Sequence, residues 1–130
     1  MTQTKRIWLI RHAESVSNVG MSTSDPATIS LSPKGFEQAN SIVQKFTGCP
    51  ELIVTSPHIR AKQTAEPLIK NYPNVLHEEW GVQEFTYLSP AKCQNMTRDE
   101  RLPMVKRYWE LSNPLYCDGP GAESFSEFIK

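Results

Sequence analysis

Several features that would narrow the function of this chain are missing from it. Its 14 basic and 14 acidic side chains leave no net charge, so nothing indicates a broad surface for nucleic acids or acidic membranes. No apolar run is long enough to span a bilayer, and no apolar signal segment precedes residue 7. These absences favour a soluble globular protein that has neither nucleic acid nor membrane as a partner.

The chain also lacks the cysteine pattern of a disulfide scaffold or a metal site. Its three cysteines, Cys49, Cys93 and Cys117, are odd in number, far apart and outside any metal-ligand spacing. We therefore expect structural thiols in a reducing, cytoplasmic setting.

What the chain does have is a short apolar run that ends in chemically useful side chains. Ile7–Ile10 is followed at once by Arg11 and His12. A continuous apolar run of this length predicts a strand buried on both faces of a parallel sheet. In such sheets ligands bind just beyond the carboxyl ends of the strands.

The next elements predict an alternation of helices and strands. Ser32 is a good N-cap for a helix that begins at Pro33, because proline is favoured at the first helical position. A second apolar strand is expected over 51–56, a helix over 60–70 and a third strand over 75–78. The 130 residues then form one α/β domain with a parallel sheet.

The second half of the chain is less regular. Residues 80–89 predict a loop that contains Glu84, and capping boxes beginning at Thr97 and Ser124 predict two further helices. The second of these has run only a few residues when the sequence stops at Lys130. We therefore expect the chain to be a C-terminally truncated piece of a longer protein.

Two strand ends predict an anion site. Arg11 and His12 follow the first expected strand, and Arg60 lies near the start of the helix after the second. Adjacent parallel strands would bring these side chains together beside a helix N-terminus. Because guanidinium groups match phosphate oxygens bidentately, a phosphate is the expected ligand.

Four motifs, in the same order, resemble those of the histidine phosphatase superfamily. The first is RHAES at 11–15 with Asn18 after it, similar to Arg-His-Gly-Glu-Ser/Thr…Asn. The others are LSPKGFEQA at 31–39, TSPHIRAKQTA at 55–65 and GAES at 121–124. The Glu-Ser after the first motif is similar to the phosphoglycerate mutase branch. The resemblance implies a three-layer α/β sandwich with a mostly parallel central sheet, incomplete at the C-terminus.

The resemblance also implies a role for each residue of the site. His12 would be the nucleophile that forms a phosphohistidine. Arg11, Arg60 and Asn18 would hold the phosphoryl oxygens, with no metal or other cofactor. Glu84 would protonate the leaving oxygen, although its surroundings match the family poorly.

Three further residues bear on this assignment. Glu78 and Glu79 are the other candidates for the acid. His58, two residues before Arg60, is expected to line the mouth of the site, where it could contact the substrate.

The sequence departs from the family in one important respect. The family has a second catalytic histidine on a later strand, whereas this chain contains only His12, His58 and His77. Loss of one charged donor costs about 3–4 kcal/mol of transition-state stabilisation, so we expect weak or undetectable turnover from this chain alone. A longer protein, a partner chain or an adapted fold are three possible explanations. An incomplete sheet would also favour self-association.

The expected function is that of a phosphomonoester hydrolase acting on a small phosphorylated substrate. A phosphoglycerate mutase-type phosphotransferase (an isomerase) and a non-catalytic phosphate-binding remnant remain alternatives. A mutase would need extra basic side chains over the site, and the candidates are Lys92, Arg98, Arg101, Lys106 and Arg107. An aromatic wall could come from Trp80, Tyr87 and Trp109.

Overall fold

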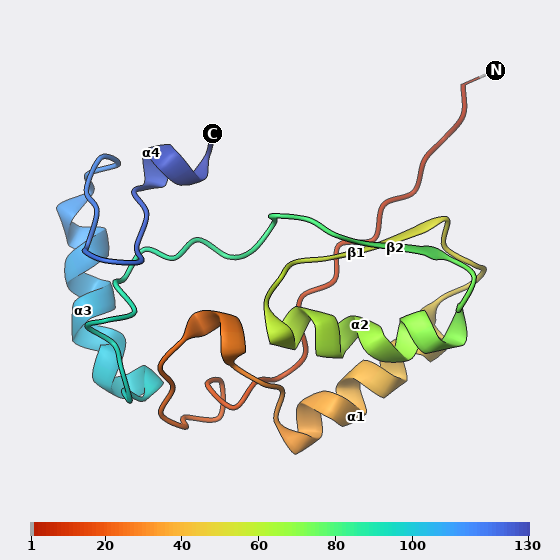
Figure 1. The fold of residues 1–130 in the computed structure, drawn as a ribbon, viewed down its shortest axis with the longest axis horizontal. Coiled ribbons are helices and arrows are strands. Elements are labelled where there is room, and N and C mark those ends of the chain that lie inside the picture. The colour runs from red at the N-terminus through yellow and green to blue at the C-terminus, as the bar shows by residue number, and fades with distance from the viewer. Residues whose placement is uncertain (1) are drawn as a thin grey trace.

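The structure, a computed structural model, describes residues 2–130 and has helices packed beside a small parallel sheet (Figure 1). The sheet pairs β1 (Leu52–Thr55) with β2 (Leu76–Glu79), with Leu52 opposite Leu76 and Thr55 opposite Glu79. Helix α2 (Ile59–Asn71) connects the two strands. The strands predicted over 51–56 and 75–78 and their parallel pairing are therefore confirmed, and the mixed α/β class with them.

Helix α1 (Pro33–Ile42) packs against α2, and the two lie on the same side of the strands in Figure 1. The predicted start of α1 is confirmed, because the Ser32 hydroxyl accepts a hydrogen bond from the Gly35 N–H at 3.1 Å. Two short 3-10 turns, η1 (Pro26–Thr28) and η2 (Val43–Lys45), flank α1. Helix α2 continues through Pro67, and its C-terminal turn ends at Tyr72.

The predicted strand at Ile7–Ile10 is wrong for this structure. The segment runs as an extended chain past the sheet (Figure 1), and among residues 2–130 no backbone hydrogen bond joins it to a neighbour. The side chains of Ile7 and Leu9 are 80% and 94% exposed, so the segment is not buried either. An apolar run becomes a strand only where another strand offers backbone partners.

The second half of the chain folds around a cluster of aromatic rings. Helix α3 (Arg98–Leu111) and the short α4 (Phe125–Phe128) begin at the predicted capping boxes of Thr97 and Ser124, which are confirmed. Rings from both helices pack on the loop that leaves β2, and Phe85 stacks on Phe128 with ring centroids 4.9 Å apart. The rings of the cluster are those of Phe85, Tyr87, Tyr108, Trp109, Tyr116, Phe125 and Phe128. The aromatic contacts therefore hold the loop after β2, through Phe85 and Tyr87, against α3 and α4.

No helix of residues 2–130 has the length and apolar character needed to cross a membrane.

Candidate active site

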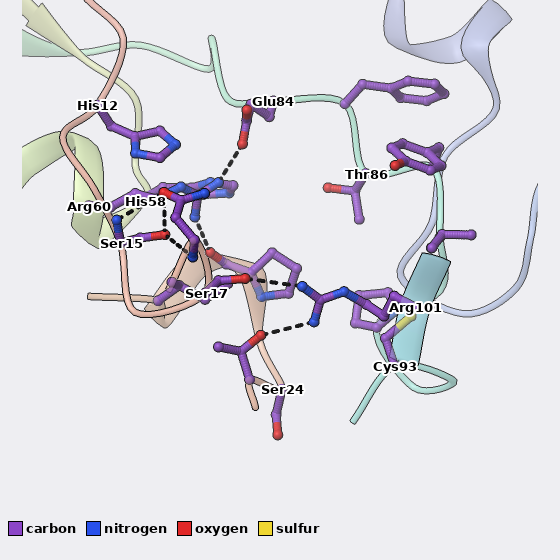
Figure 2. A pocket seen from close by; sticks show the side chains of 18 of the residues that line it. His12, Ser15, Ser17, Ser24, His58, Arg60, Glu84, Thr86, Cys93 and Arg101 are labelled. Atoms are coloured by element: carbon purple, nitrogen blue, oxygen red, sulfur yellow. Dashed lines mark hydrogen bonds and ion pairs between the residues drawn. The ribbon is translucent and has the colours of Figure 1, made fainter. Parts of the chain in front are cut away.

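All the residues expected in the site lie around one cavity of about 260 Å³. They come from the segment after residue 10, from the start of α2 and from the loop after β2, and Figure 2 shows several of them facing one another. The six are Arg11, His12, Asn18, His58, Arg60 and Glu84. The structure thus brings together side chains that lie up to 73 positions apart in the printed sequence. Glu78 and Glu79, the other candidates for the acid, are not among the lining residues.

The ring of His12 is fixed by its own backbone neighbour. Its Nδ1 lies 2.7 Å from the carbonyl oxygen of Ala13. Because a carbonyl oxygen can only accept, Nδ1 must carry the proton. In the neutral ring the lone pair then lies on Nε2, which is the atom free to act as a nucleophile.

The segment that carries His12 is anchored to α2. The Ala13 N–H donates to the Thr64 hydroxyl at 3.0 Å, and that hydroxyl donates to the carbonyl of Arg60 at 2.7 Å. Both Ala13 and Thr64 are buried. A single buried threonine therefore couples the backbone beside His12 to the first turn of the helix that carries Arg60.

The same segment is also held by the start of α1. The Ser32 hydroxyl donates to the Glu14 carboxylate at 2.7 Å, and the Ser32 N–H donates to the Glu14 carbonyl at 2.9 Å. A Cβ placed on Gly35 would lie 2.0 Å from that carbonyl oxygen. Glycine is thus the only residue that lets the helix approach so closely.

Asn18 closes the turn that follows His12. Its side-chain oxygen accepts from both the N–H and the hydroxyl of Ser15, each at 2.9 Å. Its amide nitrogen is left to donate to a ligand. This is the role that the family resemblance implies for it.

Arg60 is a buried cation with two protein partners. Its guanidinium donates to the carbonyl of Pro26 and pairs with the Glu84 carboxylate at 2.7 Å. The Arg60 side chain is 8% exposed, whereas that of Glu84 is 67% exposed. Glu84 therefore covers Arg60 from the solvent side, where an incoming anion would arrive.

This ion pair sets the charge state of Glu84. Burial raises the pKa of Glu84, but the hydrogen bond and the charge of Arg60 outweigh it, and the pKa lies below its usual value. Glu84 is therefore ionised near neutral pH while it contacts Arg60. It can serve as an acid only after an anion has taken over part of that charge.

His58 is a neutral member of the site. Burial, followed by the nearby charge of Arg60, lowers the pKa of His58 below its usual value. The side chain can therefore offer a single N–H to an anion without adding charge. His77, in contrast, lies on β2 with its Nε2 3.4 Å from the Thr55 hydroxyl and is not among the cavity residues.

Arg11 is exposed and lines the cavity. Among residues 2–130 there is no group of three or more His, Cys, Asp or Glu side chains that could hold a metal ion.

The sequence predicted only some of the other residues that line the cavity. Of the five basic residues proposed for a mutase, only Arg101 is among the lining residues, and of the three aromatic residues only Tyr87. Ser15 belongs to the RHAES motif, and Cys93 was expected only as a structural thiol. The lining residues that the sequence did not single out are Ser17, Thr23, Ser24, Pro26, Ile29, Phe85, Thr86, Leu88 and Pro90. Most of these lie in loops without periodicity, and only the tertiary structure could reveal them.

Residues 7–130 match the sequence profile of the histidine phosphatase superfamily, branch 1. Because the match covers nearly the whole chain, the protein belongs to this superfamily. No curated protein matches the chain.

Solved structures of phosphatases share the fold. An alpha-ribazole phosphatase from Shigella flexneri has 18% identity and a TM-score of 0.66, covering 92% of this chain and 59% of its own. A phosphoserine phosphatase from Entamoeba histolytica, in complex with 3-phosphoglyceric acid, has 24% identity and a TM-score of 0.64, covering 92% and 58%. A mycobacterial glucosyl-3-phosphoglycerate phosphatase has 24% identity and a TM-score of 0.61, covering 89% and 57%. The chain therefore spans less than two thirds of the length of these relatives.

Proposed function

We propose that this protein is a phosphomonoester hydrolase that works through a phosphohistidine on His12. The observation that carries the proposal is the hydrogen bond from His12 Nδ1 to the carbonyl of Ala13, which leaves Nε2 as the nucleophile within an arginine-lined cavity. Nε2 attacks phosphorus, the bond from phosphorus to the leaving oxygen breaks, and that oxygen takes a proton from Glu84. In the second step Glu84 takes a proton from water, the water oxygen attacks phosphorus, and the bond from phosphorus to Nε2 breaks, which releases phosphate, free His12 and protonated Glu84.

The remaining residues act on the phosphoryl group. Arg11 and Arg60 hold its oxygens and spread the charge of the transition state, and the side-chain amide of Asn18 and the ring of His58 add neutral donors. Binding of a phosphate dianion at Arg60 releases Glu84 from its ion pair. The carboxyl group can then take up the proton that it passes to the leaving oxygen.

The absence of a second histidine in the family motif leads us to propose low turnover for this chain by itself. One missing donor to the transition state reduces the rate about a hundred- to a thousandfold. A non-catalytic phosphate-binding protein is the second candidate, and the Arg60–Glu84 ion pair favours it because the pair keeps the acid ionised. A mutase finds less support, since only Arg101 of the proposed basic residues lines the cavity.

Phosphorylation of the chain itself tests the proposal. The protein is exposed briefly to a small activated phosphate ester, quenched at alkaline pH and measured by mass spectrometry. We expect an acid-labile phosphoryl group on His12 that is absent from His12→Ala and present in His77→Ala, the matched control outside the cavity. Phosphate binding without any label would contradict the hydrolase and leave a binding protein.

We also propose a cytoplasmic location and self-association. The odd number and wide spacing of Cys49, Cys93 and Cys117 support a reducing setting. The exposed apolar segment 7–10 has no backbone hydrogen bond to the other residues that the structure describes, so its backbone groups can pair with a second copy of the chain. Sedimentation velocity should show concentration-dependent association that Leu9→Lys weakens and Leu115→Lys, at an exposed leucine in the loop after α3, does not. An identical, monomeric profile for all three proteins would exclude self-association.

A further inference from the structure

The cavity contains a third arginine that the phosphate chemistry does not use. Figure 2 shows His12, His58 and Arg60 on one side of the cavity and Arg101 on the other. Arg101 lies near the start of α3, is half-buried and lines the cavity. A phosphate monoester whose phosphoryl group is held at the His12 end has to place its leaving group in the remaining space, which Arg101 borders.

The guanidinium group of Arg101 is held in place by neutral acceptors. Its Nη1 donates to the hydroxyl of Thr23 at 3.2 Å and to the carbonyl of Met96 at 2.9 Å, and its Nη2 donates to the hydroxyl of Ser17 at 3.0 Å. A guanidinium group has five N–H donors, so the Nε hydrogen and one Nη2 hydrogen have no acceptor among residues 2–130. The contacts therefore fix the orientation of Arg101, leave its positive charge in place and leave donors for a ligand.

The two hydroxyls that accept from Arg101 add donors of their own. Each hydroxyl has one O–H hydrogen, and neither Ser17 nor Thr23 has an acceptor for it in the part of the chain that the structure describes. Both residues line the cavity beside Arg101. A cation with two neighbouring hydroxyls suits an acceptor that has a negative charge and several lone pairs, such as a carboxylate.

The charges around the cavity leave Arg101 uncompensated. The lining has three arginines, Arg11, Arg60 and Arg101, and one carboxylate, that of Glu84. Glu84 pairs with Arg60, and within residues 2–130 no carboxylate lies at ion-pair distance from Arg101. Once a phosphate dianion is bound and Glu84 is protonated, as the proposed reaction requires, the three arginines exceed the dianion by one positive charge. One negative charge on the leaving group would balance it.

We infer that Arg101, with Ser17 and Thr23, forms a subsite for a carboxylate on the leaving group, so that the substrates are phosphate monoesters of small hydroxy acids. The inference rests on the proposed function, because it assumes that phosphate occupies the His12 end. The cavity volume of about 260 Å³ suits a phosphoryl group together with a short aliphatic acid. A neutral alcohol would leave Arg101 without a counter-charge, and a second phosphate dianion would exceed the balance.

Binding of two matched phosphonates tests the subsite without requiring turnover. The ligands 4-phosphonobutanoate and 4-phosphonobutanamide have the same chain length and a stable carbon–phosphorus bond, and differ in one charge. We expect calorimetry on the whole chain to show at least about tenfold tighter binding of the carboxylate, because hydrogen bonds between charged groups are stronger than those to a neutral amide. Equal binding, tighter binding of the amide or no binding of either compound would overturn the inference.

Removal of the charge of Arg101 should abolish this preference. Arg101→Gln is expected to bring the two affinities within about threefold of each other. Arg98→Gln is the matched control, because Arg98 lies one turn earlier in α3 and is not among the cavity residues, and it should retain the preference. A ratio unchanged by Arg101→Gln would overturn the inference even if the wild-type preference is present.

A second variant separates the charge of Arg101 from its structural contacts. Because these contacts tie α3 to the loop after His12, Arg101→Gln can lose binding of both ligands. Arg101→Lys then decides, since lysine keeps the charge without the planar fork. It should bind both ligands and still prefer the carboxylate severalfold, and no preference or no binding of either ligand would overturn the inference.

Phosphorylation of His12, measured as above on the same protein, separates this inference from the proposed function. A label on His12 without a preference for the carboxylate rejects the subsite alone. A preference without a label supports the subsite and rejects the hydrolase alone.

Discussion

Two short apolar segments of similar composition adopt different structures in this protein. Leu52–Thr55 pairs with β2 and buries Ile53, which is 7% exposed. Ile7–Ile10 is at least as apolar, but it runs exposed past the same sheet with no backbone hydrogen bond to any of residues 2–130. The difference shows that an apolar sequence alone does not form a strand, because a strand also needs a neighbour whose backbone groups are free to hydrogen-bond with it.

The residues that follow the two segments nevertheless line the same cavity. His58 and Arg60 follow the paired strand β1, whereas His12 follows an extended segment that is not a strand. The backbone after His12 is held instead by Thr64 on α2 and by Ser32 and Gly35 at α1. The helices, and not the sheet, therefore fix the position of the proposed nucleophile.

The largest effect is expected where α1 approaches the segment after His12. In Gly35→Ala the new Cβ would meet the backbone carbonyl of Glu14, which cannot move as a side chain can. We expect a loss of about 3 kcal/mol or more of unfolding free energy, at the upper end of overpacking costs. Urea denaturation measures this loss, with Gly81→Ala as the control because its Cβ would meet only a distant side-chain atom. Similar stabilities of the two variants would contradict the role given to α1.

Two isoleucine substitutions, one in each apolar segment, test the difference between the segments. Ile53→Ala removes a buried side chain of β1 and should cost about 2–3 kcal/mol of unfolding free energy. Ile7→Ala removes the same atoms from an exposed position and should cost about 0.5 kcal/mol or less. Chemical denaturation of both variants gives the comparison. An equal loss would show that segment 7–10 is buried in solution, for example by a second copy.

A smaller effect is expected at the link between α2 and His12. Thr64→Val keeps the shape of the side chain but leaves the buried N–H of Ala13 without an acceptor. We expect a loss of about 1–2 kcal/mol of unfolding free energy and slower phosphorylation of His12. Denaturation and the labelling rate measure the two effects, and Thr47→Val at an exposed position is the control. Unchanged labelling in Thr64→Val would show that the link does not position His12.

The smallest effect is a pH dependence of stability from His58. Burial and Arg60 lower the pKa of His58 in the folded protein, so the unfolded chain binds its proton first as the pH falls. Stability from this group is complete above the usual value of 6.5 and declines as the pH drops below it toward the lowered pKa. Denaturation midpoints at a series of pH values should decline less steeply in His58→Gln. An identical slope in both proteins would show that His58 ionises as freely in the fold as outside it.

The sequence predicted the elements that depend on local chemistry. Helix starts at Pro33 and after Thr97 and Ser124 follow from side chains that cap their own backbone, and such contacts need no distant partner. The strand expected at 7–10 was predicted wrongly, because an apolar run forms a strand only where a neighbouring strand offers backbone partners. The motif residues were found because they lie in recognisable order, whereas Leu88 and Ser17 enter the cavity through loop geometry alone.

If the site binds phosphate as proposed, the ion pair between Arg60 and Glu84 also affects which anions can bind. Any ligand must compete with a carboxylate that is attached to the same molecule and already 2.7 Å from the guanidinium. Chloride and other monovalent anions offer the arginine no more charge than Glu84 does, and they gain little by replacing it. Under the proposed function, a phosphate dianion carries twice the charge and lies in the cavity that Arg11 also lines, so we expect the tethered carboxylate to favour doubly charged ligands over monovalent salts.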